Sequence, residues 1–235
     1  DIELHDVEIL NQGAARSRFD ITKLSFHAWL LNRERYALLR TGAALGYGCG
    51  PLVVARQTLT RADVAGCRIA VPGELTTAHL LLRLWQPAAA DRVFLPYDRI
   101  QAAVLTGEAD CGVIIHEGRF TFADTGLVKV VDLGEWWEAD TGLPIPLGCI
   151  AARHELDSRV REDFEQLLRT SIAHARGDRG ASLSYMTEHA AELDSAVLWR
   201  HVDTFVNDFS LNLGAQGQAA VVRLEEMARA AGVIR

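Results

Sequence analysis

The sequence has 235 residues, of which 49% are hydrophobic and 23% are charged. This composition is typical of a globular protein with a large core, built as one domain or as two lobes of about 100 residues each. Lys and Arg number 24 against 31 Asp and Glu, which gives a net charge of −7. An acidic chain without basic clusters argues against nucleic acid or an anionic membrane surface as a partner.

The chain shows no apolar run near the length of about 18 residues that a membrane helix requires, and no signal peptide. Because it begins with Asp1 and not Met, we expect a processed N-terminus or a missing start. Cys49, Cys67, Cys111 and Cys149 show no CxxC spacing, and three of them adjoin apolar strand-like segments. We interpret them as buried free thiols in a reducing compartment.

The first part of the chain predicts short elements of both kinds. Residues 2–10 suggest a strand running into a short helix, 19–26 contain a short strand, and 27–39 have the apolar spacing of a helix. The glycine-rich segment 42–51 is not a P-loop, because no Lys-Ser/Thr follows it, and it precedes a strand, whereas the dinucleotide fingerprint follows one. We therefore favour a turn into strand 52–55 over a phosphate cradle.

Strands and helices alternate in the middle of the chain. The pattern predicts strands over 68–71, 93–95, 111–115 and 126–133, helices over 76–85 and 98–106, and an extended segment over 143–152. Thr76 and Thr77 stand at a strand–turn–helix junction. Such a position offers free backbone N–H groups to an anion or hydroxyl, but a threonine there also caps the helix, and both interpretations stay open.

A polar cluster follows the apolar strand that ends at Ile115. In α/β proteins, ligands bind in the crevice beyond the carboxyl ends of the strands, and His116 lies just past such an end. A histidine can act as a general base near neutral pH. Sequence context alone favours a structural role for His116, and it favours an ion pair that frames the loop for Glu117 and Arg119.

Only helices are predicted after residue 153. The hydrophobic segments 51–56 and 146–153 bracket the block of alternating strands and helices, as expected of two hinge segments between lobes. We predict a large discontinuous lobe, 1–54 and 150–235, and a small lobe, 55–149. The C-terminal helices then pack on the first lobe, and a cleft separates the two.

Several segments, in order along the whole chain, resemble the 1,4-dihydroxy-6-naphthoate synthase family of the futalosine route to menaquinone. They are TKLS (22–25), ALGYGCGPLVVAR (44–56), VPG (71–73), TTA (76–78), IIHEGRFT (114–121), DLGEWW (132–137), TGLPIPLG (141–148) and VNDFS (206–210).

The resemblance implies an α/β, two-lobed fold like that of type II periplasmic binding proteins. It implies a cytoplasmic carbon–carbon lyase, acting without a metal or cofactor, that converts cyclic dehypoxanthinyl futalosine to 1,4-dihydroxy-6-naphthoate and dihydroxyacetone. The small-molecule substrate would lie in the cleft between the lobes. By motif, His116 would be the proton acceptor, and the substrate-binding segments would be Lys23-Leu24-Ser25 and Thr77-Ala78.

One departure and two alternatives accompany this interpretation. Family members begin with a strand and a Ser-Pro-Cys-Pro-Asn-Asp loop that lines the cleft, and nothing here corresponds to it, so we expect that the sequence lacks its N-terminal part. The alternatives are chorismate dehydratase of the same pathway and a non-catalytic solute-binding protein. His116 and the segment 144–148 favour the synthase. Asn207 is a candidate cleft residue, and Trp136 and Trp137 are expected to pack.

Overall fold

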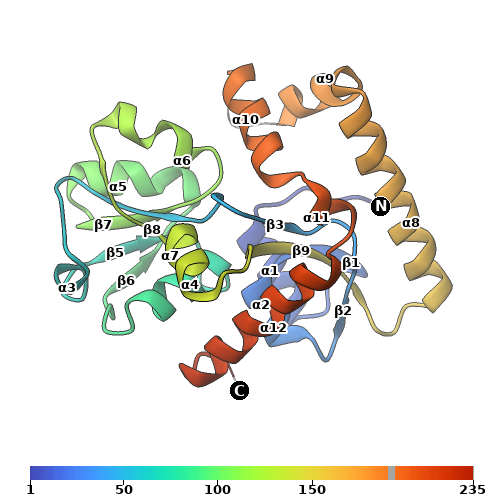
Figure 1. The fold of residues 1–235 in the computed structure, drawn as a ribbon, viewed down its shortest axis with the longest axis horizontal. Helices are drawn as coiled ribbons and strands as arrows, with labels where there is room; N and C mark the ends of the chain where they lie inside the picture. The colour runs from blue at the N-terminus through green and yellow to red at the C-terminus, as the bar shows by residue number, and fades with distance from the viewer. Residues whose placement is uncertain (190–193, 235) are drawn as a thin grey trace.

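The computed structural model describes residues 1–189 and 194–234, which form two β-sheets with helices around them (Figure 1). The first sheet is organised on β9, Ile145–Arg153. Three shorter strands all pair antiparallel with it. They are β1 (Ile21–Ser25), β2 (Tyr36–Leu38) and β3 (Ala44–Gly46).

The second sheet has five strands in the order β6-β5-β7-β4-β8. Their bounds are β4 (Leu52–Ala55), β5 (Ile69–Val71), β6 (Arg92–Phe94), β7 (Cys111–Ile114) and β8 (Val128–Asp132). β5 runs parallel to β6 and β7, whereas β4 is antiparallel to both of its neighbours. The carboxyl ends of the parallel strands therefore share one edge, where ligands bind in α/β folds.

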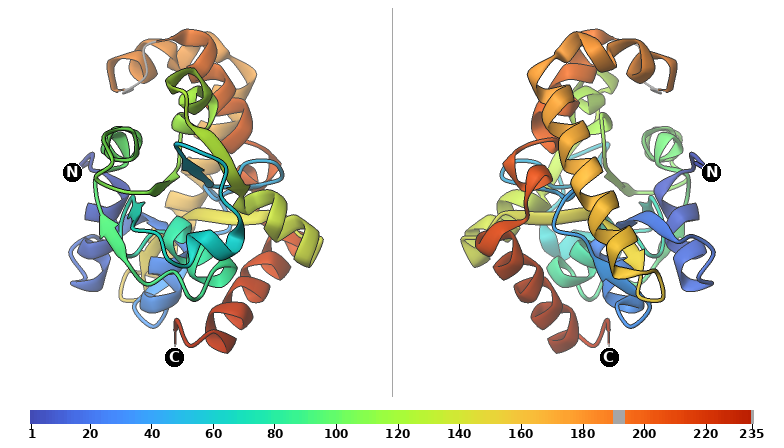
Figure 2. Two further views of the ribbon diagram at one scale, coloured as in Figure 1. Left: turned by 90° about the vertical axis from the view of Figure 1, so that its left-hand side faces the viewer. Right: turned by 90° about the vertical axis from the view of Figure 1, so that its right-hand side faces the viewer.

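The helices before β9 lie around the two sheets. They are α1 (Val7–Ala15), α2 (Phe26–Asn32), α3 (Arg61–Val64), α4 (Thr77–Trp85), α5 (Ile100–Thr106), α6 (Gly118–Thr121) and α7 (Leu133–Thr141), with 3-10 turns at Tyr97–Arg99 and Phe122–Thr125. The helices after β9 are α8 (Ser158–Gly177), α9 (Arg179–His189), α10 (Ser195–Phe205), α11 (Asp208–Leu211) and α12 (Gly214–Ala230). In both views of Figure 2, α9 and α10 lie at one end of the molecule and α12 at the other, and the right-hand view shows α8 running down from the first end along one side.

One hydrophobic cluster runs through both sheets, because α4 is buried between them. Seven of the nine residues of α4 are buried, among them Leu80, Leu81 and Leu82. Alternation along β4 divides its side chains between two clusters: Val53 faces the main core, and Val54 faces the smaller core under α5. The C-terminal helices differ from one another. α12 buries five residues, whereas α8 buries none and exposes the large side chains of Val160 and Leu167.

The chain crosses between the sheets just before β4 and just before β9. At the first crossing the backbone of Gly50 lies directly against that of Gly134, the second residue of α7. A β-carbon on Gly50 would lie 2.2 Å from the amide nitrogen of Gly134, so no other residue leaves this contact intact. We propose the division into lobes 1–54 with 150–235 and 55–149, since both crossings fall within a few residues of these limits.

Two predicted elements near the N-terminus are wrong in part. Residues 2–6 form no strand, and α1 begins after Asp6, whose side chain accepts a hydrogen bond from the amide of Glu8. The helix predicted over 27–39 ends at Asn32, and Tyr36 begins β2. The apolar spacing does continue past Asn32, but pairing with β9 and a hydrogen bond from the Tyr36 hydroxyl to the Phe19 carbonyl favour a strand there.

We predict that Gly50→Ala lowers the free energy of unfolding by about 3 kcal/mol, because the new methyl group meets backbone atoms that cannot move aside. Gly177→Ala is the control, since a β-carbon there meets nothing within 4 Å and its effect should stay below about 1 kcal/mol. Urea denaturation compares the two. Equal midpoints for the two variants would contradict the close approach of Gly50 and Gly134.

Candidate active site

A cavity of about 120 Å³ lies where the two sheets meet, and it collects residues from segments far apart in the sequence. The residues of its wall that carry polar side chains are Lys23, Ser25, Cys49, Thr76, Thr77, His116, Arg119 and His201. Five of the six predicted site residues line it, namely Lys23, Ser25, Thr77, Ala78 and His116. Leu24 is different: its side chain is fully buried in the main core.

The N-terminus of α4 forms one wall. The Thr76 hydroxyl accepts a hydrogen bond from the amide of His79 (3.2 Å) and donates one to the carbonyl of Gly73 (2.9 Å), so Thr76 is the N-cap. The Thr77 hydroxyl donates to the carbonyl of Leu147 in β9 (2.7 Å). The amides of Thr77 and Ala78 belong to the first turn, which has no intrahelical partners, and are available to a ligand.

The carboxyl end of β1 forms a neighbouring part of the wall. Asn11, fully buried in α1, receives a hydrogen bond from the amide of Ser25 (2.9 Å) and donates one to its hydroxyl (3.1 Å), which orients that side chain. Lys23 extends into the cavity, where its side chain stays accessible. Desolvation by the surrounding walls lowers the pKa of Lys23, and the charge of Asp6 opposes that shift.

His116 follows β7 with a φ of 56°, in the left-handed region that residues other than glycine rarely adopt. This conformation turns the imidazole from the end of the strand into the cavity, between the rings of Tyr97 (centroids 5.2 Å apart, edge on) and His201 (5.8 Å, stacked). Burial, together with the charges of Lys23 and His201, lowers the pKa of His116 to about 3. The ring is therefore neutral at physiological pH, as a proton acceptor must be.

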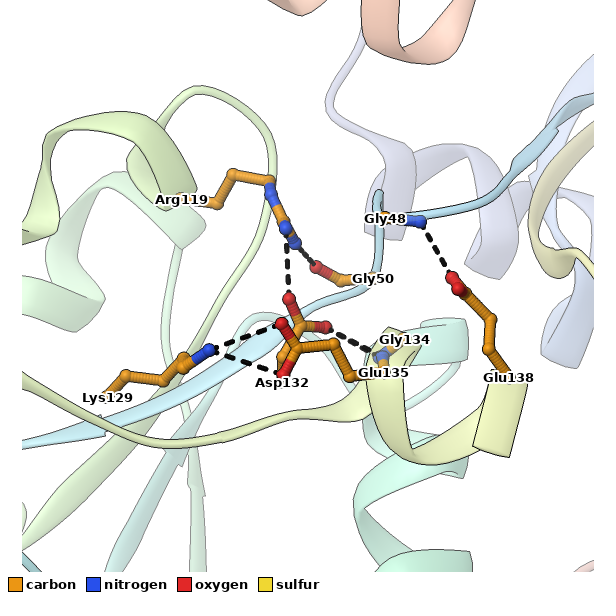
Figure 3. Close-up of polar contacts among 8 residues, drawn as sticks. All are labelled: Gly48, Gly50, Arg119, Lys129, Asp132, Gly134, Glu135 and Glu138. Carbon is orange, nitrogen blue, oxygen red and sulfur yellow. Dashed lines mark hydrogen bonds and ion pairs between the residues drawn. The ribbon is translucent and has the colours of Figure 1, made fainter. Parts of the chain in front are cut away.

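Arg119 supports the loop that carries His116 (Figure 3). Its guanidinium donates to the carbonyl of Gly50 and to a carboxylate oxygen of Asp132 (3.0 Å). The other oxygen of Asp132 accepts from the amides of Gly134 and Glu135 and so caps α7. The ion pair predicted for Arg119 thus exists with Asp132. Asp132 is 3% exposed and Arg119 14%, so the pair is held out of water.

The glycine-rich segment 42–51, predicted as a turn, forms the short strand β3 and then a turn into β4, and the protein itself engages polar groups of that turn. The amide of Gly48 donates to a carboxylate oxygen of Glu138 in α7 (2.7 Å; Figure 3). Cys49, between the two docked glycines, reaches the cavity, but burial raises the pKa of its thiol to about 12. A neutral thiol is a poor nucleophile, so Cys49 serves as part of the wall.

His201 and Phe205 of α10 complete the cavity, and neither was predicted from the sequence. Their four-residue spacing places them on one helix face, but it does not reveal which cavity that face meets. Asn207, a predicted cleft residue, instead caps α11 and donates to the carbonyl of Leu45 (2.9 Å). Within residues 1–189 and 194–234, no group of three or more His, Cys, Asp or Glu is arranged to hold a metal ion.

The fold and the cavity define a two-lobed protein of the periplasmic-binding-protein type. The alkanesulfonate-binding protein of Xanthomonas axonopodis pv. citri, solved with MOPS, aligns with a TM-score of 0.70 at 18% identity, over 97% of this chain and 81% of its own. A crystal structure of a protein from Archaeoglobus fulgidus aligns with a TM-score of 0.93 at 40% identity, over 98% and 86%.

Residues 1–230 match the family model described as menaquinone biosynthesis. Two curated relatives named 1,4-dihydroxy-6-naphthoate synthase are 48% identical (Thermus thermophilus, 98% of this chain and 84% of that protein) and 41% identical (Streptomyces coelicolor, 100% and 84%). The chain therefore belongs to the menaquinone biosynthesis family, and it is an enzyme. No helix in the described part of the chain has both the length and the apolar character to cross a membrane.

Two buried histidines behind the Thr76–Thr77 turn predict a dependence of stability on pH. The pKa of His27 and that of His79 are each lowered to about 4, mainly by burial. The charge of Arg83 lowers both pKa values, that of Arg92 lowers the pKa of His79, and that of His79 lowers the pKa of His27. Below about pH 6.5 the unfolded chain binds protons at these rings that the folded protein does not, so stability falls as the pH falls.

We expect each ring to cost about 2 kcal/mol of stability between pH 6.5 and pH 5. Urea denaturation at both pH values measures the fall. The double variant with His27→Gln and His79→Gln should show a smaller fall, even if it is less stable at pH 7. An equal fall in both proteins would show that other groups cause it.

Proposed function

We propose that this enzyme is a carbon–carbon lyase that converts cyclic dehypoxanthinyl futalosine to 1,4-dihydroxy-6-naphthoate and dihydroxyacetone, with His116 as the general base. The observation that carries the proposal is a neutral imidazole, turned into a cavity whose lining also includes Lys23, Ser25 and the first turn of α4. The names of the two curated relatives support the same reaction. We also propose the cytoplasm as its location, in line with four free cysteines.

The proposed chemistry requires one base. Removal of a hydroxyl proton from the substrate allows the adjacent C–C bond to break in a retro-aldol sense, and a neutral histidine accepts such a proton without help from a metal. Ser25 and the amides of Thr77 and Ala78 would hydrogen-bond substrate hydroxyls or its carboxylate. Closure of the lobes around the substrate would exclude water from the reactive intermediate.

Lys23 is the proposed partner of the substrate carboxylate. Its ammonium makes no ion pair or hydrogen bond within the part of the chain that the structure describes, and it extends into the cavity. A charge-assisted hydrogen bond of this kind contributes about 1.5–3 kcal/mol. A carboxylate bound to Lys23 would lie beside His116, since the charge of Lys23 acts on that ring.

We expect His116→Gln to lower kcat by a factor of about 10² to 10⁴, the usual contribution of a general base. The measurement is the rate of naphthoate formation from the cyclic substrate by the purified full chain. His174→Gln, an exposed histidine of α8, is the matched control and should leave kcat unchanged. Full turnover by His116→Gln would refute the base, and binding of the substrate without turnover by the natural chain would support a solute-binding protein instead.

We expect Lys23→Met to raise KM about tenfold or more, because the carboxylate loses its charged partner. The same change should raise the pKa of His116, since the positive charge that lowers it is gone. The acidic limb of the kcat/KM profile would then shift to higher pH, and steady-state rates measured from pH 8 down to about pH 3, where the pKa of His116 lies, test this. A variant with unchanged KM would place the carboxylate elsewhere.

A further inference from the structure

His201 faces the same cavity as His116 but comes from a different part of the chain. It lies on α10 and stacks on His116 with ring centroids 5.8 Å apart and an angle of 29° between the planes. Its Nδ1 atom is 4.0 Å from a carboxylate oxygen of Glu117. Two imidazoles, both partly accessible, therefore meet in the wall of the cavity.

His201 is held in place by ring contacts, and its side chain is 29% exposed. Neither nitrogen of the His201 ring makes a hydrogen bond to the part of the chain that the structure describes, and its apolar neighbour Phe205 packs on the ring only (4.7 Å). By contrast, His27 and His79 each use a ring nitrogen to bind a backbone carbonyl. His201 is thus free to exchange protons with a bound molecule.

The reaction proposed above needs a second proton transfer, at a different atom. In a retro-aldol cleavage the O–H bond of one carbon breaks, and its proton goes to the base. A C=O bond forms as the C–C bond breaks, and the electron pair stays on the departing three-carbon fragment as an enediolate. A new C–H bond must then form on that fragment to give dihydroxyacetone, so one proton is taken up by the protein and one is returned.

We propose that His201 is a second catalytic residue of this site, which returns to the departing three-carbon fragment the proton that His116 removes. This inference rests on the proposed function. The proton passes from one ring to the other through a hydroxyl of the substrate bound against both. The number of protons balances, because both histidines are neutral at the start and at the end of each turnover.

Both rings are neutral before the substrate binds. Burial and the nearby charge of Lys23 lower the pKa of His201 to about 4 and contribute to lowering that of His116 to about 3. When the substrate carboxylate neutralises Lys23, the pKa values of both rings rise toward their ordinary range, which makes proton uptake easier only in the complex.

The test compares His201→Ala with the natural chain in naphthoate formation from cyclic dehypoxanthinyl futalosine. We expect kcat to fall about 100-fold with KM changed less than about threefold, as for the loss of one acid–base group. Imidazole added to the buffer should restore at least about a tenth of the lost rate. Pyrazole, which has the same shape but is a far weaker base, should not. Asp203→Asn, an exposed change on the same helix, should leave kcat unchanged.

Each outcome decides between the proposals. If the natural chain forms naphthoate and His201→Ala does so within threefold of its rate, the inference is wrong and the proposed function stands. Equal rescue by pyrazole and imidazole would reduce His201 to a space-filling role and also overturn the inference. Should His201→Ala fail to fold, His201→Gln must show the same loss of kcat. A natural chain that makes no naphthoate would refute the proposed function, and the inference with it.

Discussion

The backbones of Gly50 and Gly134 touch at the point where the chain first crosses between its sheets, and the cavity depends on that contact. Arg119 and Asp132 close it from the side, since one guanidinium binds the Gly50 carbonyl and the carboxylate that caps α7. The loop of Arg119 also carries His116. The position of the proposed base is therefore set by the backbone contact between two glycines and by one buried ion pair, and not by contacts of the imidazole itself.

Positive charge lies within the cavity, and negative charge lies at its margins. Lys23 supplies a positive charge, and the closest carboxylates act at its margins: Asp6 on Lys23, and Glu117 beside His201. Burial keeps the two imidazoles neutral, and the nearby ammonium adds to this effect by repelling a second positive charge. A site of this kind suits the anionic, hydroxyl-bearing substrate proposed above.

The sequence predicted those helices, strands and turns that are determined by interactions between residues close together in the chain. The buried strand before His116, the turn after Val71 and the helix that ends at Gly107 all follow from apolar runs, threonine caps and a left-handed glycine. β2 was missed because its three residues continue a helical spacing and become a strand only against β9. The resemblance of whole segments to a family supplied His116 and Lys23. His201 had no such signal, since apart from Phe205 on the same helix its neighbours in the cavity are about 50 or more residues away in the chain.

α10 contributes His201 and Phe205 to the cavity, yet none of its described residues is buried, and the same is true of α8. Segments with so little buried apolar surface open locally at a small fraction of the free energy needed for global unfolding. We therefore expect two unfolding transitions. In the first, α10 opens locally and the cavity loses a wall while both sheets stay folded; the second is global unfolding. A ligand that contacts both α10 and the loop after β7 would oppose the local opening of α10. Binding in the cavity would then increase the order of this end of the molecule.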